Sequence, residues 1–196
     1  MSPLNKHQLN QIRDERREQI KQAALIRFAR HGYLGTKTSM IAAEAGISEG
    51  LIFRYFKSKD VLFTTLVQEL IEEAKLETEN LQYLPGSPFE QIKALTTGML
   101  DESSKYAFML ILRARKTDEI PEEAARILEQ HSEDVILERL ISIFIQGQEA
   151  GEFSPGDPRK LLAWYFSIIN CLIMEEVAME EYGLPNADYL MRFLKT

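Results

Sequence analysis

The chain has 196 residues, and 45% of them are hydrophobic, which is enough to bury a core in one domain or two small ones. This composition excludes intrinsic disorder over most of the chain. The single cysteine, Cys171, excludes an internal disulfide, and the apolar run around it predicts a buried, inert thiol. The three histidines lie far apart, with no cysteine or histidine at ligand spacing, which excludes a zinc finger.

The net charge of −7 hides an asymmetry between the two parts of the chain. Residues 1–60 carry eleven Lys and Arg against six Asp and Glu, a net charge of +5. Residues 61–196 carry twelve against twenty-four, a net charge of −12. The basic part predicts a polyanionic partner for that part alone, although a solvated basic face would give the same charge.

The apolar segments are too short to predict a membrane span. The longest uncharged run, residues 161–174, has fourteen residues, and crossing a bilayer takes about 20 apolar residues. The run therefore predicts a buried helix. Because the first residues also lack the apolar stretch of a signal peptide, we expect a cytoplasmic protein with no membrane partner.

Apolar residues at helical spacing, together with end caps, predict four helices in the first eighty residues. They cover residues 13–31, 37–45, 49–56 and 59–80. Gly32 follows the first helix as a C-cap, and Gly46 supplies the turn after the second. Ser48 and Ser58 are the expected N-caps of the third and fourth helices.

Residues 84–88 contain two prolines and a glycine and are the clearest linker. Five more helices are predicted beyond it, at residues 88–100, 102–116, 121–150, 158–182 and 186–194. Nowhere do β-branched and polar residues alternate between turn signals as in a strand. The predicted fold is therefore all-α, with about nine helices.

The second and third predicted helices, joined by residues 44–48, have the pattern of a helix-turn-helix, whose second helix lies in the DNA major groove. Residues 20–63 around them resemble the N-terminal domain of the TetR family of bacterial transcriptional regulators. The matching landmarks are Ala23-Ala24, Phe28-Ala29, Gly32-Tyr33, Thr36, Ile41-Ala42, Ala45-Gly46-Ile47-Ser48, Gly50, Phe56, Lys57-Ser58-Lys59-Asp60 and Leu62-Phe63. The resemblance implies a DNA-binding domain at residues 14–74, with the helix-turn-helix at about 37–56, and a helical effector-binding and dimerisation domain at residues 84–196.

The same resemblance implies DNA contacts by residues of the helix-turn-helix and the start of the fourth helix. They are Lys37, Thr38, Ser48, Glu49, Gly50, Phe53, Arg54, Tyr55 and Lys59. Thr38 and Lys59 match phosphate contacts, and Gly50 lets the backbone approach the bases. Arg54 can pair with phosphate or, bidentately, with guanine, and we expect it to be the strongest contact. Phe53 replaces the usual tyrosine, so the phosphate hydrogen bond of a phenol is absent.

Several of these residues allow a simpler interpretation. Thr38 is also an ordinary polar residue at a helix end. Glu49 can accept a hydrogen bond from cytosine, or it is only a first-turn acid favoured by the helix dipole. Arg27 stands where the family usually has an apolar residue, which leaves the packing of the first helix open.

The basic residues at the start of the first helix are also open to two interpretations. Arg13, Arg16, Arg17 and Lys21 could extend an arm toward DNA. Acidic residues interleave with them, so a solvated helix face is an equal alternative.

The acidic remainder offers candidates for a ligand cavity and for a dimer interface. Aromatic and methionine side chains would line a cavity, although they would equally fill an ordinary core. The ligand candidates are Met99, Tyr106, Phe108, Met109, Phe144, Trp164 and Tyr165. Residues 161–174 are apolar on nearly every side of their helix, which predicts self-association, and the resemblance implies that the last two helices form a homodimer interface. Its candidates are Ile168, Leu172, Met179, Tyr189, Leu190 and Phe193.

Taken together, the resemblance implies a sequence-specific transcriptional regulator. We expect a homodimeric repressor that binds a palindromic operator in double-stranded DNA and is released by a small hydrophobic effector. The alternative is a DNA-binding architectural or protein-interaction module without a small-molecule effector. The sequence has no catalytic constellation and no glycine-rich phosphate loop, so we expect no enzyme activity, no catalytic residue, no metal and no cofactor.

Overall fold

The computed structural model describes residues 6–81, 83–101, 103–131, 133–175 and 181–195. Within these ranges the regular structure is helical throughout, which confirms the all-α prediction. The helices are α1 (Lys6–Gly35), α2 (Thr38–Glu44), α3 (Glu49–Tyr55), α4 (Lys59–Leu81), α5 (Pro88–Met99), α6 (Lys105–Arg115), α7 (Glu122–Gln130), α8 (Glu133–Glu149), α9 (Pro158–Met174) and α11 (Ala187–Met191).

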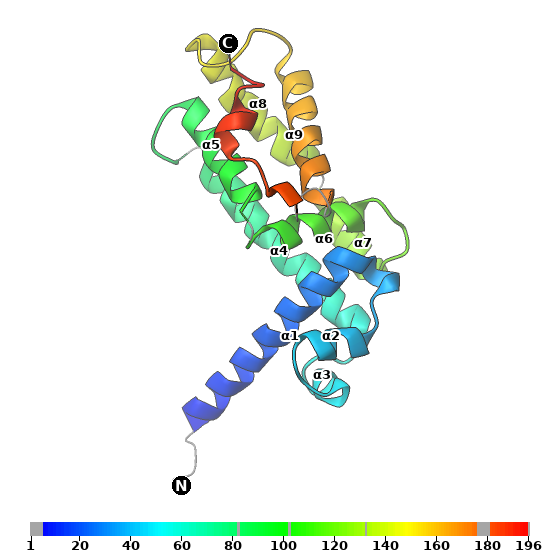
Figure 1. The fold of residues 1–196 in the computed structure, drawn as a ribbon. Coiled ribbons are helices and arrows are strands. Elements are labelled where there is room, and N and C mark those ends of the chain that lie inside the picture. Colours follow the sequence, from blue (N-terminus) through cyan, green and yellow to red (C-terminus); the bar gives the residue numbers. More distant parts are fainter. Residues whose placement is uncertain (1–5, 82, 102, 132, 176–180, 196) are drawn as a thin grey trace.

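The molecule is elongated, with α2 and α3 at one end and α5, α8, α9 and α11 at the other (Figure 1). The long helix α4 starts beside α3 and runs into the second group, so it connects the two ends. Helix α1 packs on α2 and α4 and also on α6, which belongs to the C-terminal group. The buried apolar residues form one cluster that runs through both parts.

Helix α1 begins at Lys6, earlier than the sequence predicts, and its first half projects from the body (Figure 1). Its core stripe is the predicted one, since Ile20, Ala24 and Phe28 are all at most 1% exposed. Gly32 breaks the helix with φ 69° and ψ 176°, which confirms it as the C-terminal signal. The Phe28 ring packs edge-on against Phe63 of α4 at 5.0 Å between centroids and thereby fixes α1 on α4.

The single helix predicted at residues 121–150 is wrong, because the chain forms α7 and α8 with a break at His131 (φ −120°, ψ 63°). Arg115 of α6 stabilises this break. Its guanidinium donates to the carbonyl oxygens of Leu128 (3.0 Å) and His131 (2.6 Å), which lie at the end of α7. The carbonyls left free at the end of α7 thus accept hydrogen bonds from a charged side chain of another helix. The sequence of α7 and α8 alone does not reveal this donor.

The helix predicted at residues 158–182 is also interrupted, and residues 181–182 within its range are again helical. Helix α9 stops at Met174, and Glu175 leaves the helical backbone with ψ 79°. Neither glycine nor proline stands at this position, so the sequence has no stop signal there. The last predicted helix, residues 186–194, is shortened to α11, which is capped by the Asn186 side chain accepting from the Asp188 amide.

The face of α9 that is not packed in the core remains exposed. Leu162, Tyr165, Ile169 and Ile173 are buried, whereas Cys171 is exposed. The prediction of a buried thiol is therefore wrong, because an apolar run alone does not tell which side of its helix the chain itself covers. Among the described residues, no helix is long and apolar enough to cross a membrane.

Candidate nucleic-acid interface

The turn between α2 and α3 has the geometry that a helix-turn-helix needs. Gly46 adopts φ 63°, and the amide of Ile47 donates back to the carbonyl of Ala42 at 3.0 Å. This closes the end of α2 and redirects the chain into α3 within four residues, 45–48. The buried side chains of Ile41 and Ile52, each at most 1% exposed, fix the two helices on the core.

Helix α1 braces this turn through two polar contacts. The Gln19 amide nitrogen donates to the carbonyl of Ala45 at 2.7 Å, which satisfies a group left free at the end of α2. Arg27 forms an ion pair with Glu44, with Nη2 2.6 Å from the carboxylate. The arginine in a usually apolar position is thus explained by its partner on α2, which neutralises its charge.

Helix α3 exposes one face of its first turns to solvent. Ser48, Glu49, Gly50 and Arg54 are exposed, and Phe53 is 49% exposed. Ser48 occupies the N-cap position but makes no side-chain cap hydrogen bond, so its hydroxyl is available. A methyl group added at Gly50 would meet nothing within 4 Å. The start of α3 is therefore open enough for another backbone to approach closely.

Thr38 and Glu49 lie against each other. The Thr38 hydroxyl donates to the Glu49 carboxylate, linking the first turn of α2 to the first turn of α3. Within the described residues, the exposed Arg54 has neither a hydrogen bond nor an ion pair. Its planar donors are therefore free to bind phosphate or a guanine edge, as the sequence predicts.

Lys59 is half-buried and binds the protein itself. Its ammonium donates to the carbonyl oxygens of Tyr33 (2.8 Å) and Thr36 (3.1 Å) and lies 4.0 Å from the centre of the Tyr33 ring. Burial lowers its pKa, against the opposing effect of Asp60. Two donors of the ammonium are thus used to hold the loop before α2.

The remaining predicted contact residues lie at the edge of this surface. Lys37 is exposed at the N-cap of α2, whereas Tyr55 is half-buried and packs on the core. Sequence reasoning missed Tyr33 as a support of the site. Its hydroxyl donates to Asp60 at 2.6 Å, and burial with this hydrogen bond raises its pKa to about 12. The sequence contains the pairs Gly32-Tyr33 and Lys59-Asp60, but it does not reveal that Tyr33 contacts Asp60.

The structure does not bring the seven ligand candidates together around one described cavity. Phe144 of α8 stacks on Phe153 at 4.4 Å between ring centroids, and both rings are buried in the hydrophobic core. Tyr106 lies under Arg30 of α1, 5.4 Å from the guanidinium carbon to the ring centre. Trp164 is 57% exposed, on the outer side of α9. Met99 and Met109 are buried, and Phe108 is half-buried.

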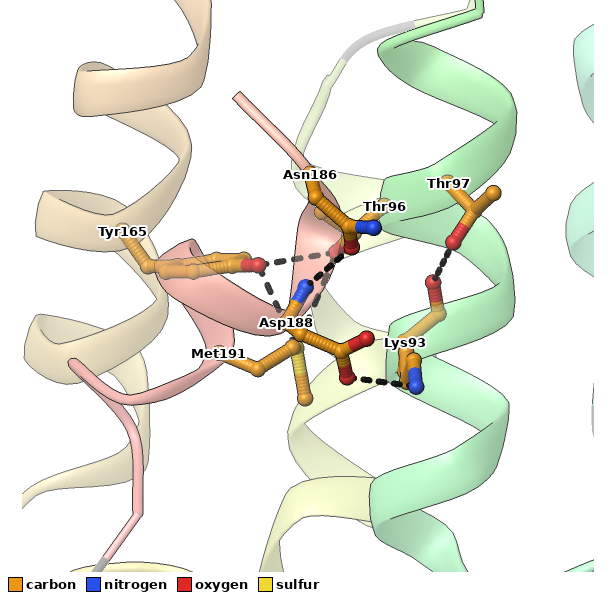
Figure 2. Close-up of polar contacts among 7 residues, drawn as sticks. All are labelled: Lys93, Thr96, Thr97, Tyr165, Asn186, Asp188 and Met191. Carbon is orange, nitrogen blue, oxygen red and sulfur yellow. Dashed lines mark hydrogen bonds and ion pairs between the residues drawn. The ribbon is translucent and has the colours of Figure 1, made fainter.

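Tyr165, the remaining candidate, belongs to a buried polar cluster. Figure 2 shows Thr96 of α5, Tyr165 of α9 and Met191 of α11 meeting between their helices. The two hydroxyls are 2.9 Å apart, and the Tyr165 hydroxyl is 3.2 Å from the Met191 sulfur. Thr96 donates to the carbonyl of Ile92, also at 2.9 Å. Burial raises the pKa of Tyr165 to about 12, so it stays neutral and satisfied in the core.

Of the dimer candidates, Ile168, Tyr189 and Phe193 are 39%, 65% and 46% exposed, as an unpartnered apolar face requires. Leu172 and Leu190 are half-buried. Met179 lies outside the described residues. The exposed Trp164 lies one turn before Ile168 on the outer side of α9, so it fits this face better than a cavity wall.

A tight turn between two short helices, braced by α1 and exposing the start of the second helix, defines a helix-turn-helix DNA-binding protein. The model of the bacterial regulatory proteins, tetR family, matches residues 20–66. The HTH-type transcriptional regulator YfiR of Bacillus subtilis is 28% identical over 94% of this chain and 92% of its own length.

Solved structures share the whole fold. A TetR-family transcriptional regulator from Agrobacterium tumefaciens gives a TM-score of 0.69 at 19% identity, covering 93% of this chain and 99% of that one. The transcriptional regulator FadR from Bacillus subtilis, in complex with stearoyl-CoA, gives 0.59 at 22% identity, covering 91% and 97%. This chain belongs to the tetR family of bacterial regulatory proteins and is a DNA-binding transcriptional regulator.

Proposed function

We propose that this regulator is a homodimeric repressor that binds a palindromic operator in double-stranded DNA and is released by a small hydrophobic effector. The observation that carries the DNA-binding part is the open start of α3, where Gly50 has free space around it and Arg54 has no described partner within the chain. Residues 14–74 would form the DNA-binding domain and residues 84–196 the effector and dimerisation domain. Because the operator lies in the bacterial chromosome, the protein would act in the cytoplasm.

The homodimer is supported by the apolar side chains that α9 and the segment after it leave in solvent. Trp164 and Ile168 are exposed on α9, and Tyr189 and Phe193 follow near the chain end. Burying such a surface against a second copy would remove it from water. A two-fold dimer would also place two α3 helices in successive major grooves, about 34–36 Å apart, and this spacing reads a palindrome.

Release by an effector requires that the ligand bind more tightly to a conformation that does not fit DNA. A coupling free energy of about 1–3 kcal/mol is typical of such switches. Helix α4 is the proposed transmitter, because it begins with Lys59 at the DNA-binding end and runs into the C-terminal helices (Figure 1). The FadR complex shows an acyl-CoA held by a protein of this fold, so stearoyl-CoA is a suitable first probe.

The second candidate is a DNA-binding architectural or protein-interaction module without an effector. It is favoured by the small size of the cavity described where α1, α4 and α6 meet. This cavity, lined by Phe28, Phe63, Leu110 and Arg113 among others, measures about 20 Å³. That volume holds about one water molecule and no effector.

The test of the proposed function is selection of binding sites from random-sequence DNA by the purified chain near physiological salt. We expect enrichment of a palindrome whose half-sites are one helical turn or a multiple apart. Addition of stearoyl-CoA to the complex with the enriched duplex then tests release. Failure to enrich any sequence would contradict the repressor, whereas an enriched palindrome from which no small molecule displaces the protein would favour the second candidate.

A further inference from the structure

The first half of α1 reaches beyond the hydrophobic core of the N-terminal helices. Among the side chains of α1 that the structure describes, Ile20 is the first buried one, and residues 10–15 are all exposed. At 1.5 Å per residue, residues 6–19 extend α1 by roughly 20 Å past this point. Figure 1 shows this half projecting away from the C-terminal helices about as far as α3 does. This half of α1 packs little against the core, so its surface is available for a contact outside the chain.

Charges on this half of the helix are separated into two faces. With about 100° per residue, Arg13, Arg16 and Arg17 fall within an arc of roughly 100°, centred on the direction of Ile20. We call these three residues the basic stripe. The acidic residues Asp14, Glu15 and Glu18 lie within a similar arc on the opposite side. The interleaving of charges along the sequence thus becomes segregation around the helix.

The basic stripe faces the helix-turn-helix. The guanidinium carbon of Arg17 lies 4.5 Å from the centre of the Phe56 ring, directly after α3. Arg13 is one turn further out on the same face, exposed and without a hydrogen bond or ion pair in the described part of the chain. Lys21, by contrast, is neutralised by ion pairs with Glu18 (2.8 Å) and Glu69 (2.7 Å). Charge available for a partner is therefore concentrated toward the projecting end of α1.

We propose that the basic stripe of α1 binds the phosphate backbone of the duplex flanking the base pairs that α3 contacts. This inference rests on the proposed function, because it uses the same DNA. A duplex laid across the open start of α3 passes beside the projecting half of α1, since both lie at the end of the molecule remote from α9. Arginine guanidinium groups suit phosphate, and the acidic face opposite would be turned away from the DNA.

The test compares the salt dependence of DNA binding for the full-length chain and two variants, each with one positive charge removed. Arg13→Ala removes the exposed member of the basic stripe, and Lys75→Ala removes an exposed charge of α4. Both substitutions favour helix, and circular dichroism and thermal melting verify the fold. Two duplexes are used, one limited to the enriched palindrome and one extended by about one helical turn on each side.

On the long duplex, we expect Arg13→Ala to make the slope of log affinity against log salt shallower by about 0.9 for each phosphate that the variant no longer neutralises. On the short duplex, the slope for Arg13→Ala should equal the wild-type slope. Lys75→Ala should have the wild-type slope on both duplexes. An unchanged slope for Arg13→Ala on the long duplex would overturn the proposal. Phosphate binding does not depend on sequence, so a long random duplex gives the same comparison if no palindrome is enriched. Failure of the proposed function therefore remains distinguishable from failure of the basic stripe to bind phosphate.

Discussion

At the scale of single residues, the DNA-binding end is held together by side chains that bind backbone carbonyls. Lys59 bonds to the carbonyls of Tyr33 and Thr36, and Gln19 bonds to that of Ala45. These carbonyls lie in or beside irregular backbone, where no helical amide is available to them. The position of α2 and α3 on the core therefore depends on a few polar contacts as well as on apolar burial.

We predict that Lys59→Ala lowers the free energy of unfolding by about 1–3 kcal/mol, because it removes a charged donor from two carbonyls. Urea denaturation followed by circular dichroism measures this. Lys57→Ala is the matched control, since it removes the same charge from an exposed neighbour. Equal stability of the two variants would mean that Lys59 serves only the phosphate contact that the sequence predicts.

For Arg54 we predict a reduction in affinity that depends on operator sequence. If its guanidinium binds a guanine edge, Arg54→Ala should cost about 1–3 kcal/mol of DNA-binding free energy and relax the preference at one operator position. Arg54→Lys keeps the charge but not the bidentate geometry, so it should relax that position in the same way. Restored specificity in the lysine variant would instead indicate a phosphate contact.

Residue roles were predictable from the sequence where they depend on local structure. Gly46 and Gly32 both adopt the positive φ that their positions at helix ends predict. The roles of Arg27 and Lys59 could not be predicted in the same way, because their partners are distant in the sequence. Arg27 pairs with Glu44, and Lys59 binds carbonyl oxygens 23 and 26 residues away. Tertiary contacts of this kind have no signature in a single sequence.

At the scale of elements, the packing of α8 depends on a glycine. A methyl group at Gly147 would clash with the Phe153 ring and would lie 3.1 Å from Cβ of Pro88. Phe153 is 2% exposed and stacks on Phe144 of α8. Phe153 thus packs the short connection after α8 back onto that helix. At this distance, only a glycine at position 147 leaves room for the Phe153 ring.

We predict that Gly147→Ala destabilises the fold by about 1–3 kcal/mol, the typical cost of overpacking a core. Gly98→Ala in α5 is the control, because a methyl group there meets nothing within 4 Å. It should stabilise the fold by about 0.5–1 kcal/mol through helix propensity. Thermal melting of the two variants gives the comparison, and a Gly147 variant as stable as wild type would contradict the packing described here.

Element types were predictable because the apolar spacing is helical throughout, but two boundaries were not. The breaks at His131 and Glu175 fall at residues that commonly continue helices. At His131 the guanidinium of Arg115 stabilises the end of α7, and this donor comes from another helix. Helix ends made by tertiary contacts, rather than by glycine or proline, are invisible to periodicity.

At the scale of the whole molecule, we expect two copies to assemble through the exposed apolar face of α9. The sequence predicts an excess of apolar residues in this helix, and the structure places the excess on the side away from the core. In the proposed dimer, this face meets its copy and sets the separation of the two α3 helices. In that dimer, the contact between the copies and DNA binding would be coupled through the spacing of the half-sites.

We predict that Ile168→Glu converts the dimer to monomers, because it buries a charge in the centre of the proposed interface. Leu76→Glu on α4 is the control, since Leu76 is 59% exposed and lies outside that face. Sedimentation velocity at micromolar concentration distinguishes the two species. A monomeric wild type would contradict the homodimer, and an Ile168 variant that stays dimeric would show that the dimer contact lies elsewhere.

The most direct test of the DNA-reading surface is the affinity of Gly50→Ala for the enriched duplex. The protein itself has room for this methyl group, so folding and melting temperature should be unchanged or slightly improved. If the start of α3 approaches the DNA backbone or bases closely, affinity should fall by at least about tenfold, or about 1.4 kcal/mol. Wild-type affinity in this variant would contradict the assignment of α3 as the recognition helix.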